Sequence, residues 1–509
     1  TSCLSGPIQT VIGRSEVSDT ARGSKPPRWS LDAIYPGLDG APFNRDIERL
    51  RNAIDQARQA IDDDASRIRD PAEWVRTVVP LVEECADRFE NLESFAYAAY
   101  SVDTGDAAAQ RALTTVGALT VPLSELSVRF RNALAAIEQP LDRLVTDNGD
   151  LTPYRYVLEE ELFFQSRQMT SAEESLAADL ARSGADAWSR LQESVSSTLS
   201  ARWNEKTGER KTVVQLRALA YDRDRAVRRK AWRLELESWK RVETPLAFAL
   251  NGVKGSTITV NTRRGWTDTL ERSARQNRIS PGTLGALTET MRESLPTFRN
   301  YLRTKARHLG VPVLSFYDIF APVGSTTTTW SFDDALAFIV ERLSTFDPEL
   351  GRFVESARDR RWIDAEPRSG KVGGAYCIDF PVAGESRILA NFDGTYDGMS
   401  TLAHELGHAW HSHLLRTLPG SLRRYPMTLA ETASIFNETI VFSAALETAG
   451  DPAEERYILE QYLQGATQVV VDILSRFEFE SELMRRREDH ELPADELCEL
   501  MLTAQKNTR

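Results

Sequence analysis

The sequence has few cysteines and no long apolar run. Its four cysteines are Cys3, Cys85, Cys377 and Cys498. They are too few and too scattered for a disulfide framework or a cysteine-based zinc site. No stretch approaches the ~18 consecutive apolar residues of a transmembrane helix, and no charged-then-apolar leader opens the chain. These absences predict a reducing, cytoplasmic setting and no membrane partner.

An excess of basic residues is lacking as well. Lys and Arg number 62 against 75 Asp and Glu, which gives a formal net charge of −13. An acidic chain gains nothing from counterion release on DNA or RNA, so we expect no nucleic-acid partner. The 41% apolar and 27% charged residues are typical of a globular protein, and 509 residues allow two to four domains. Because the first residue is Thr1 rather than Met, we interpret the sequence as a fragment or a processed chain.

Helical periodicity dominates the chain. Residues 1–27 are rich in Ser, Thr, Gly and Pro without periodicity and are predicted to be a disordered tail. Apolar residues then recur every three or four positions, which predicts amphipathic helices. Helices are expected over residues 47–61, 81–100 and 221–242, with further helix starts near residues 170 and 331. The basic cluster at residues 223–230 is interpreted as a solvated helix face.

The pattern changes near Gly370. Residues 370–376 contain too much glycine for a helix interior, and residues 375–380 and 386–391 read as two short strands. Helical periodicity then continues almost to Arg509. The sequence therefore predicts a mainly α fold with one small β patch, placed directly before its most informative segment.

That segment is a His-Glu-x-x-His motif. His404 and His408 are four residues apart, so both imidazoles lie on one face of a helix and can bind one metal ion, for which zinc is suited. Glu405 is placed to take a proton from a water that the metal activates. The alternative is a surface helix with clustered histidines. Against it, four of the six histidines in the chain fall within ten residues (His404, His408, His411 and His413).

A catalytic zinc needs a third protein ligand. The position that would hold the third histidine of a metzincin is Leu414, so that class is excluded. Glu431 and Glu438, seven residues apart on a later helix, are the candidates. A turn at residues 418–420 would let this helix pack antiparallel and bring Glu431 to the metal, with Glu438 supporting a histidine from behind. An exposed helix acid is the alternative for each.

These motifs resemble the oligoendopeptidase F and thimet oligopeptidase family of zinc metallopeptidases, and are closest to its bacterial oligoendopeptidase F branch. The resemblance spans about residues 28–509 and rests on the His404–His411 segment and on Glu431-x-x-Ser434-x-x-x-Glu438. Three upstream blocks agree with it: Trp29-Ser30-Leu31-Asp32 with Tyr35-Pro36-Gly37, Gly373-Gly374-Ala375-Tyr376, and Ser386-Arg387-Ile388-Leu389-Ala390-Asn391.

The resemblance implies a helical bowl with an internal channel, one Zn²⁺ per chain at its base, and short unstructured oligopeptides as substrates. It implies that His404, His408 and Glu431 are zinc ligands and that Glu405 is the catalytic base. Glu438 and His411 would lie in the second shell, and Gly373, Gly374, Ala375 and Tyr376 would lie along the bound peptide.

The resemblance also suggests a division of the chain. We expect a tail at 1–27, a helical region at 28–125, an oligoendopeptidase F-like N-terminal helical domain at 126–195 and a catalytic domain at 196–509. Family members continue beyond the segment that resembles residues 491–509, with His and Tyr groups that stabilise the oxyanion, so we expect the C-terminal end to be missing. We assign that role to none of Tyr457, Tyr462 and His490.

The sequence therefore predicts a zinc-dependent endopeptidase. The alternatives are an incomplete or non-catalytic chain that binds zinc and peptide, and a peptidase that trims dipeptides from a chain end. Neither peptide preference nor oligomeric state can be read from the residues.

Overall fold

A computed structural model describes residues 25–324 and 328–509, which form two compact units. Within the described part of the chain, unit 1 comprises residues 25–175 and 329–441, and unit 2 comprises residues 176–324, 328 and 442–509. The helices α8 (Ser171–Ser183) and α20 (Thr432–Glu447) run across the boundaries between the units. The predicted four-part division of the sequence stays a prediction, and most of the predicted tail lies outside the described residues.

Unit 1 contains the larger sheet and the His-rich helix. It is built from two stretches of the sequence, residues 25–175 and 329–441, with a long break between them. Its helices before the long break in sequence are α1 (Ala41–Ile61), α2 (Asp64–Arg69), α3 (Pro71–Val102), α4 (Ala107–Gly117), α5 (Thr120–Ala135), α6 (Leu141–Asp147), the 3₁₀ helix η1 (Gly149–Tyr154) and α7 (Arg155–Gln165). After the break come α15 (Phe332–Phe346), α16 (Pro348–Asp359), β3 (Ile363–Asp364), β4 (Tyr376–Phe380), β5 (Glu385–Leu389), α17 (Tyr396–Leu415), α18 (Gly420–Arg423) and α19 (Met427–Ala430).

Unit 2 is also helical. It contains α9 (Ala185–Thr198), β1 (Ser200–Arg202), β2 (Arg210–Thr212), α10 (Val213–Ala218), η2 (Leu219–Tyr221), α11 (Arg225–Lys240), α12 (Glu243–Arg263), α13 (Thr269–Gln276), α14 (Pro281–His308) and η3 (Phe316–Asp318). Its C-terminal part contains α21 (Pro452–Thr467), the π-helical segment η4 (Gln468–Asp472), α22 (Ile473–Arg487) and α23 (Ala494–Thr508). No helix of the described residues combines the length and the apolar character needed to cross a membrane.

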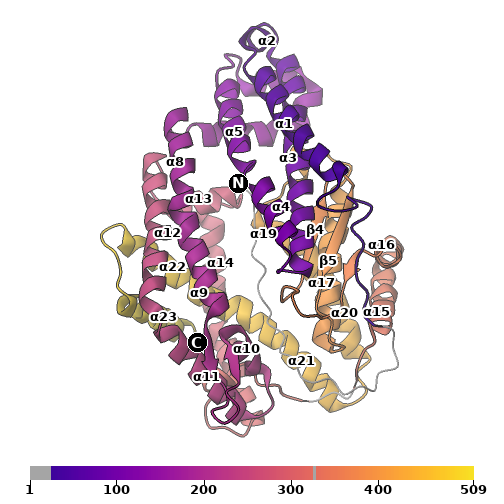
Figure 1. Cartoon of the computed structure of the whole chain (residues 1–509). Coiled ribbons are helices and arrows are strands. Elements are labelled where there is room, and N and C mark those ends of the chain that lie inside the picture. Colours follow the sequence, from indigo (N-terminus) through magenta and orange to yellow (C-terminus); the bar gives the residue numbers. More distant parts are fainter. Residues whose placement is uncertain (1–24, 325–327) are drawn as a thin grey trace. The chain divides into compact units, whose positions relative to one another are not determined.

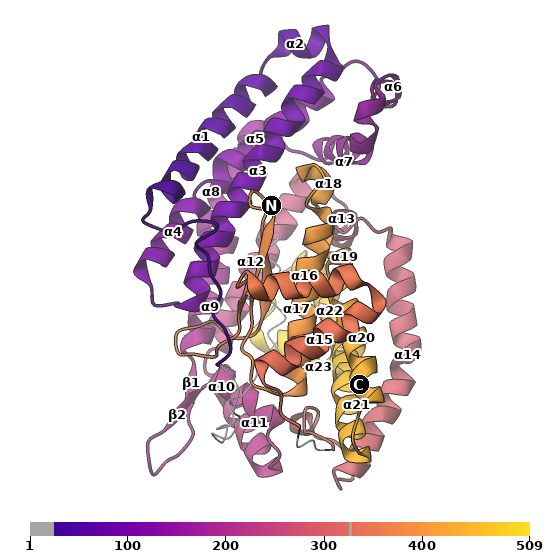
Figure 2. The ribbon, with the colours of Figure 1, turned by 90° about the vertical axis from the view of Figure 1, so that its right-hand side faces the viewer.

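The two longest helices of the N-terminal part, α1 and α3, pack side by side in unit 1 (Figure 2). Their apolar faces are fully buried at Leu50, Ile54 and Leu92, and burial of such a side chain contributes about 1.5–3 kcal/mol. Phe380 of β4 and Leu389 of β5 belong to the same core. The N-terminal helices therefore support one side of the small sheet.

The larger sheet has the order β3-β5-β4. Strands β4 and β5 correspond to the two short strands that the sequence predicts, and they pair antiparallel, with Tyr376 opposite Leu389 and Phe380 opposite Glu385. Helix α17 packs against both strands (Figure 1). Strand β4 lies at the edge of this sheet, and its side that faces away from β5 pairs with no strand among the described residues.

The prediction of a mainly helical chain with a small β patch beside the His-rich helix is confirmed. The expected bowl with its channel stays a prediction. The prediction of one strand patch was wrong in detail, because β3 pairs in parallel with β5 and the three-residue strands β1 and β2 pair antiparallel. Strands of two or three residues are too short to leave a period-2 pattern in the sequence.

The predicted helix starts are confirmed. Thr170 accepts a hydrogen bond from the Glu173 amide at 3.3 Å while Glu173 accepts one from the Thr170 amide at 3.1 Å. Ser331 caps α15 by accepting a hydrogen bond from the Asp334 amide. The prediction of a solvated basic face at residues 223–230 was wrong in part, because Arg228 is buried and pairs with the buried Asp318 at 3.0 Å.

Candidate metal centre

Helix α17 carries the histidine motif on one face and an apolar surface on the other. Thr395 caps its first turn by accepting a hydrogen bond from the Gly398 amide at 3.0 Å. Met399, Leu402 and Leu406 are fully buried beneath it. This burial fixes the rotation of the helix, so the opposite face presents His404 and His408 together.

The two imidazoles converge on one carboxylate oxygen. His404 Nε2 lies 3.1 Å and His408 Nε2 lies 3.2 Å from the same Oε2 atom of Glu431. The candidate ligand atoms of the three residues all lie within 4.8 Å of one another, and no other group of this kind occurs in the residues that the structure describes. Two imidazole nitrogens and one carboxylate oxygen form a donor set that suits zinc, so the residues fit a metal ion.

The electrostatics of this group fit a cation between its members. Hydrogen bonds from His404 and His408 hold the pKa of the Glu431 carboxyl far below its usual range. Burial opposes the charge on His404, but its hydrogen bonds with Glu431 and Glu438 outweigh burial and raise its pKa to about 10. A proton on His404 therefore supplies positive charge at the centre of the group.

Glu405 is buried next to the first histidine, with 6% of its surface exposed. Burial raises the pKa of its carboxyl to about 7, while the positive charges of His404 and His408 and a hydrogen bond from the Cys377 backbone act in the opposite direction. A carboxyl group with this pKa can both accept and release a proton near neutral pH.

Gly407 allows α17 and the start of α20 to approach each other closely. A β-carbon at Gly407 would lie 2.5 Å from the carbonyl oxygen of Ala433 and 2.6 Å from the Cα of Ser434. The buried Asn437 side chain donates a hydrogen bond to the Ala403 carbonyl at 3.3 Å, next to His404. The close crossing brings Glu431 to the two histidines.

Three side chains support the candidate ligands from behind. Glu438 Oε2 lies 3.3 Å from His404 Nδ1, the nitrogen that faces away from Glu431. Ser400 donates a hydrogen bond to the other Glu438 oxygen at 3.4 Å, and Ser434 donates one to Glu431 Oε2 at 2.7 Å. Such contacts orient a histidine ring and fix its tautomer.

The structure differs from the sequence analysis at Glu431 itself. The sequence predicts one helix that carries both Glu431 and Glu438, but helix α19 ends at Ala430 and α20 begins at Thr432. Glu431 occupies the break, with φ −91° and ψ 6°. Its side chain is therefore aimed by the break and by Ser434 rather than by helical periodicity.

His411 lies one turn beyond His408 on α17. Its ring stacks on Tyr425, with centroids 4.4 Å apart and planes at 23°. Its Nδ1 atom is buried and makes no hydrogen bond to a described residue. The structure thus places His411 beside Tyr425, and its predicted role in the second shell stays a prediction.

The glycine-rich segment before β4 is held at both ends. Asn391 donates hydrogen bonds to the carbonyls of Val372 at 3.0 Å and Gly374 at 2.9 Å. Gly374 has φ +79°, a conformation that other residues rarely adopt, and Gly373 has open space around it. The segment is an ordered turn that leads into the outer strand of the sheet.

Of the four residues expected along a peptide, Tyr376 has the most contacts of its own. Its hydroxyl lies 2.5 Å from Ser101 Oγ, and its ring packs against Tyr97 with centroids 5.3 Å apart. It therefore joins β4 to helix α3. Gly373 and Gly374 have no side chain and Ala375 has only a methyl group, so their backbone, apart from the Gly374 carbonyl that Asn391 binds, is the part left for other contacts.

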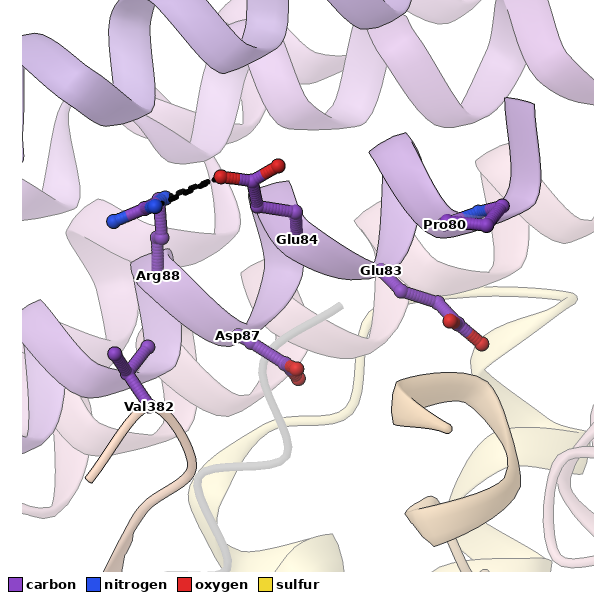
Figure 3. A pocket seen from close by; sticks show the side chains of 6 residues that line it. All are labelled: Pro80, Glu83, Glu84, Asp87, Arg88 and Val382. Carbon is purple, nitrogen blue, oxygen red and sulfur yellow. Dashed lines mark hydrogen bonds and ion pairs between the residues drawn. The ribbon is translucent and has the colours of Figure 1, made fainter. Parts of the chain in front are cut away.

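A separate hollow of about 370 Å³ lies on the surface of α3 and is polar (Figure 3). It is lined by Pro80, Glu83, Glu84, Asp87, Arg88 and Val382. Arg88 and Glu84 pair within it at 2.8 Å, whereas Glu83 and Asp87 extend from another side of the helix. None of the candidate ligands lines this hollow.

Sequence reasoning assigned no role to Ser400, Ser434, Asn437, Asn391 or Tyr425, although Ser434 and Asn391 belong to the motifs quoted for the resemblance. Only Ser434 left a usable signal, because a serine three residues after an acid on a helix can bind that acid. The other four act on partners that are distant in the sequence or reached through a turn.

Comparisons with known proteins agree on one family. The sequence profile described as peptidase family M3 matches residues 218–499, which is more than half of the chain, and the profile described as oligopeptidase F matches residues 134–200. An oligoendopeptidase F homologue of Lactococcus lactis is 28% identical over 269 residues, which cover 52% of this chain and 44% of the relative. Oligopeptidase PepF of Bacillus subtilis is 21% identical over 446 residues, 86% of this chain and 65% of the relative. The matches thus span about half to two thirds of these relatives.

Solved structures share the fold. A Chlamydophila abortus protein assigned as a peptidase superposes with a TM-score of 0.73 at 19% identity, covering 98% of this chain and 82% of that one. Oligoendopeptidase-F from Enterococcus faecium superposes with a TM-score of 0.63 at 19% identity, covering 91% of this chain and 79% of that one.

Proposed function

The chain belongs to peptidase family M3, and from this premise we propose that it is a zinc-dependent endopeptidase that hydrolyses short unstructured oligopeptides. The observation that carries the proposal is the convergence of His404 Nε2 and His408 Nε2 on Glu431 Oε2, beside the buried Glu405. Three protein ligands with a neighbouring carboxylate are the arrangement of a catalytic rather than a structural zinc site.

In this proposal His404, His408 and Glu431 hold one zinc ion per chain. Zinc bound there would polarise the carbonyl group of the scissile bond and lower the pKa of water. Glu438 keeps the His404 ring in place through Nδ1, and Ser434 keeps the Glu431 carboxylate turned toward the histidines.

Glu405 acts as the general base and then as the general acid. It accepts the proton of the attacking water and delivers it to the nitrogen of the leaving amine. Its buried position, with a pKa raised to about 7, supports both steps, because the carboxyl group can hold the proton between them near neutral pH.

The substrate is expected to bind as an extended strand. The second edge of β4 has no partner strand among the described residues, and the Asn391-held turn at residues 372–374 leads into it. Backbone pairing along such an edge does not depend on side chains, which suits oligopeptides of varied sequence. A cytoplasmic setting belongs to the same proposal and is supported by the free thiols of Cys85, Cys377 and Cys498.

The test is cleavage of an internally quenched peptide of about a dozen residues by zinc-loaded protein, with metal content measured in parallel. Internal cleavage, identified from product masses, is expected, and a stably folded protein offered as substrate should stay intact. Zinc binding without any cleavage would favour the peptide-binding alternative. Products that are all dipeptides from one end would favour end trimming.

A further inference from the structure

Tyr425 lies in unit 1, on the short segment between α18 and α19, and this segment is anchored to α3. Glu83 accepts hydrogen bonds from the Ser421 amide, at 2.9 Å, and from the Ser421 hydroxyl, and Asp87 pairs with Arg423. Figure 3 shows the Glu83 and Asp87 side chains that make these contacts. The segment that carries Tyr425 is therefore held in place before any ligand binds.

The ring of Tyr425 is also fixed. It stacks on His411 with centroids 4.4 Å apart and planes at 23°, and the next residue is Pro426, whose ring restricts the backbone. A side chain that is already immobilised loses little entropy when a ligand engages it.

The Tyr425 side chain is partly buried, and the charges of several acidic groups act on its phenol, among them that of the candidate ligand Glu431. Burial raises the pKa of the phenol well above its usual range, and the charges of Asp379, Cys377, Glu90 and Glu431 raise it further. The phenol therefore keeps its proton and is available as a donor. No hydrogen bond joins this hydroxyl to a residue that the structure describes, although a partly buried tyrosine hydroxyl usually has a partner.

We propose that the Tyr425 hydroxyl donates a hydrogen bond to a main-chain carbonyl of the peptide bound beside the metal centre. A neutral carbonyl suits this donor, because the negative charge of Glu431 acts on the phenol and disfavours an anionic group such as a free peptide C-terminus. Tyr425 is thus a residue that contacts an internal part of the substrate. This inference rests on the proposed function and deepens it.

The test measures peptide binding without turnover. A fluorescein-labelled peptide of about nine residues with an amidated C-terminus is titrated into zinc-loaded Glu405→Gln protein and into the double variant Glu405→Gln/Tyr425→Phe. Loss of one hydrogen bond should raise Kd about five- to tenfold, with helical content and zinc content unchanged. Tyr462→Phe is the matched control, since Tyr462 also stacks on an aromatic ring, Phe442, at 4.3 Å and 17°, and it should leave Kd unchanged.

Each other outcome overturns the inference. Equal Kd values within twofold would show that the hydroxyl makes no contact with the peptide. Loss of zinc or of helical content in Tyr425→Phe would show that the protein itself uses the hydroxyl, and absence of any peptide binding would exclude a peptide contact altogether. If the wild-type protein binds the peptide without cleaving it, the proposed function fails while the Kd comparison still decides the role of Tyr425.

Discussion

Gly407 and Ser434 lie so close together that a β-carbon on Gly407 would stand 2.6 Å from the Cα of Ser434. The contact is between two backbones, so neither side can move without shifting a helix. The position of Glu431 relative to His404 and His408 depends on this crossing.

Gly407→Ala should therefore move Glu431 away from His404 and His408. We expect a loss of about 1–3 kcal/mol of stability from overpacking and a marked loss of zinc affinity, measured by thermal unfolding and by metal content after dialysis against a chelator. Gly465→Ala is the control, because Gly465 is also helical but has open space around it. It should retain zinc and be slightly more stable. Full zinc content in Gly407→Ala would mean that the crossing does not position Glu431.

Glu431 and Glu438 should behave differently when replaced. Glu431→Ala removes a proposed zinc ligand, so this variant should lose zinc at moderate chelator concentrations. Glu438→Gln removes only the support behind His404 and should keep zinc with an affinity about 10–100-fold weaker. Wild-type zinc content in Glu431→Ala would remove Glu431 from the ligand set.

Glu405→Gln should separate metal binding from hydrolysis. The amide keeps the shape of the side chain but cannot accept the proton, so we expect full zinc content with a fall in kcat of about 10²–10⁴-fold. Metal analysis and cleavage of the quenched peptide measure the two properties on one sample. Retention of a tenth of the wild-type rate would contradict the role of Glu405.

Zinc binding should release a proton from His404. In the metal-free protein the pKa of His404 is about 10, so the ring is protonated at pH 8, whereas an imidazole bound to zinc through Nε2 with Glu438 at Nδ1 is neutral. We expect release of about one proton per zinc at pH 8 and a zinc affinity that rises with pH between about 7 and 9. Calorimetry in two buffers of different ionisation enthalpy measures the release.

The Glu438→Gln variant provides the comparison for this titration. Removal of one of the two carboxylates that hold the His404 proton lowers the pKa of the ring, so the variant should release fewer protons at pH 8 than the wild type. Equal release by both proteins would show that Glu438 does not act on His404.

Asn391→Ala should weaken substrate binding more than catalysis. The side chain holds the carbonyls of Val372 and Gly374, and without it the turn before β4 becomes looser. We expect KM for the quenched peptide to rise about fivefold with little change in kcat. Asn148→Ala is the control, since Asn148 also donates to a backbone carbonyl, that of Leu144, but is distant from β4 in the sequence. An unchanged KM would separate this turn from the peptide.

The sequence was sufficient for features that depend on local periodicity. The spacing of His404 and His408 and the short strand predicted at residues 375–380 depend only on neighbours along the chain, and both elements form close to where they were predicted. The break at Glu431 was not predictable, because it depends on how α20 crosses α17 at Gly407.

Contacts between residues that are far apart in the sequence could not be predicted either. Arg228 looked like a surface residue because its partner Asp318 is 90 positions away. The stack of His411 on Tyr425 needs the turn between α17 and α19, whose course depends on Glu83 and Asp87 of a distant helix. Local sequence carries no record of such partners.

The small sheet of unit 1 has a consequence for the order of folding. Its strand β5 is secured by Arg387, which donates to the Ser30 carbonyl at 2.8 Å across 357 positions, and Ala365 donates to the Pro27 carbonyl. Because this unit is completed only when residues 329–441 join residues 25–175, the N-terminal stretch emerges from the ribosome long before its partner. Contacts of such wide separation form slowly, so the apolar face of β4 and β5 and the candidate metal ligands should be assembled late, after most of the chain has been synthesised.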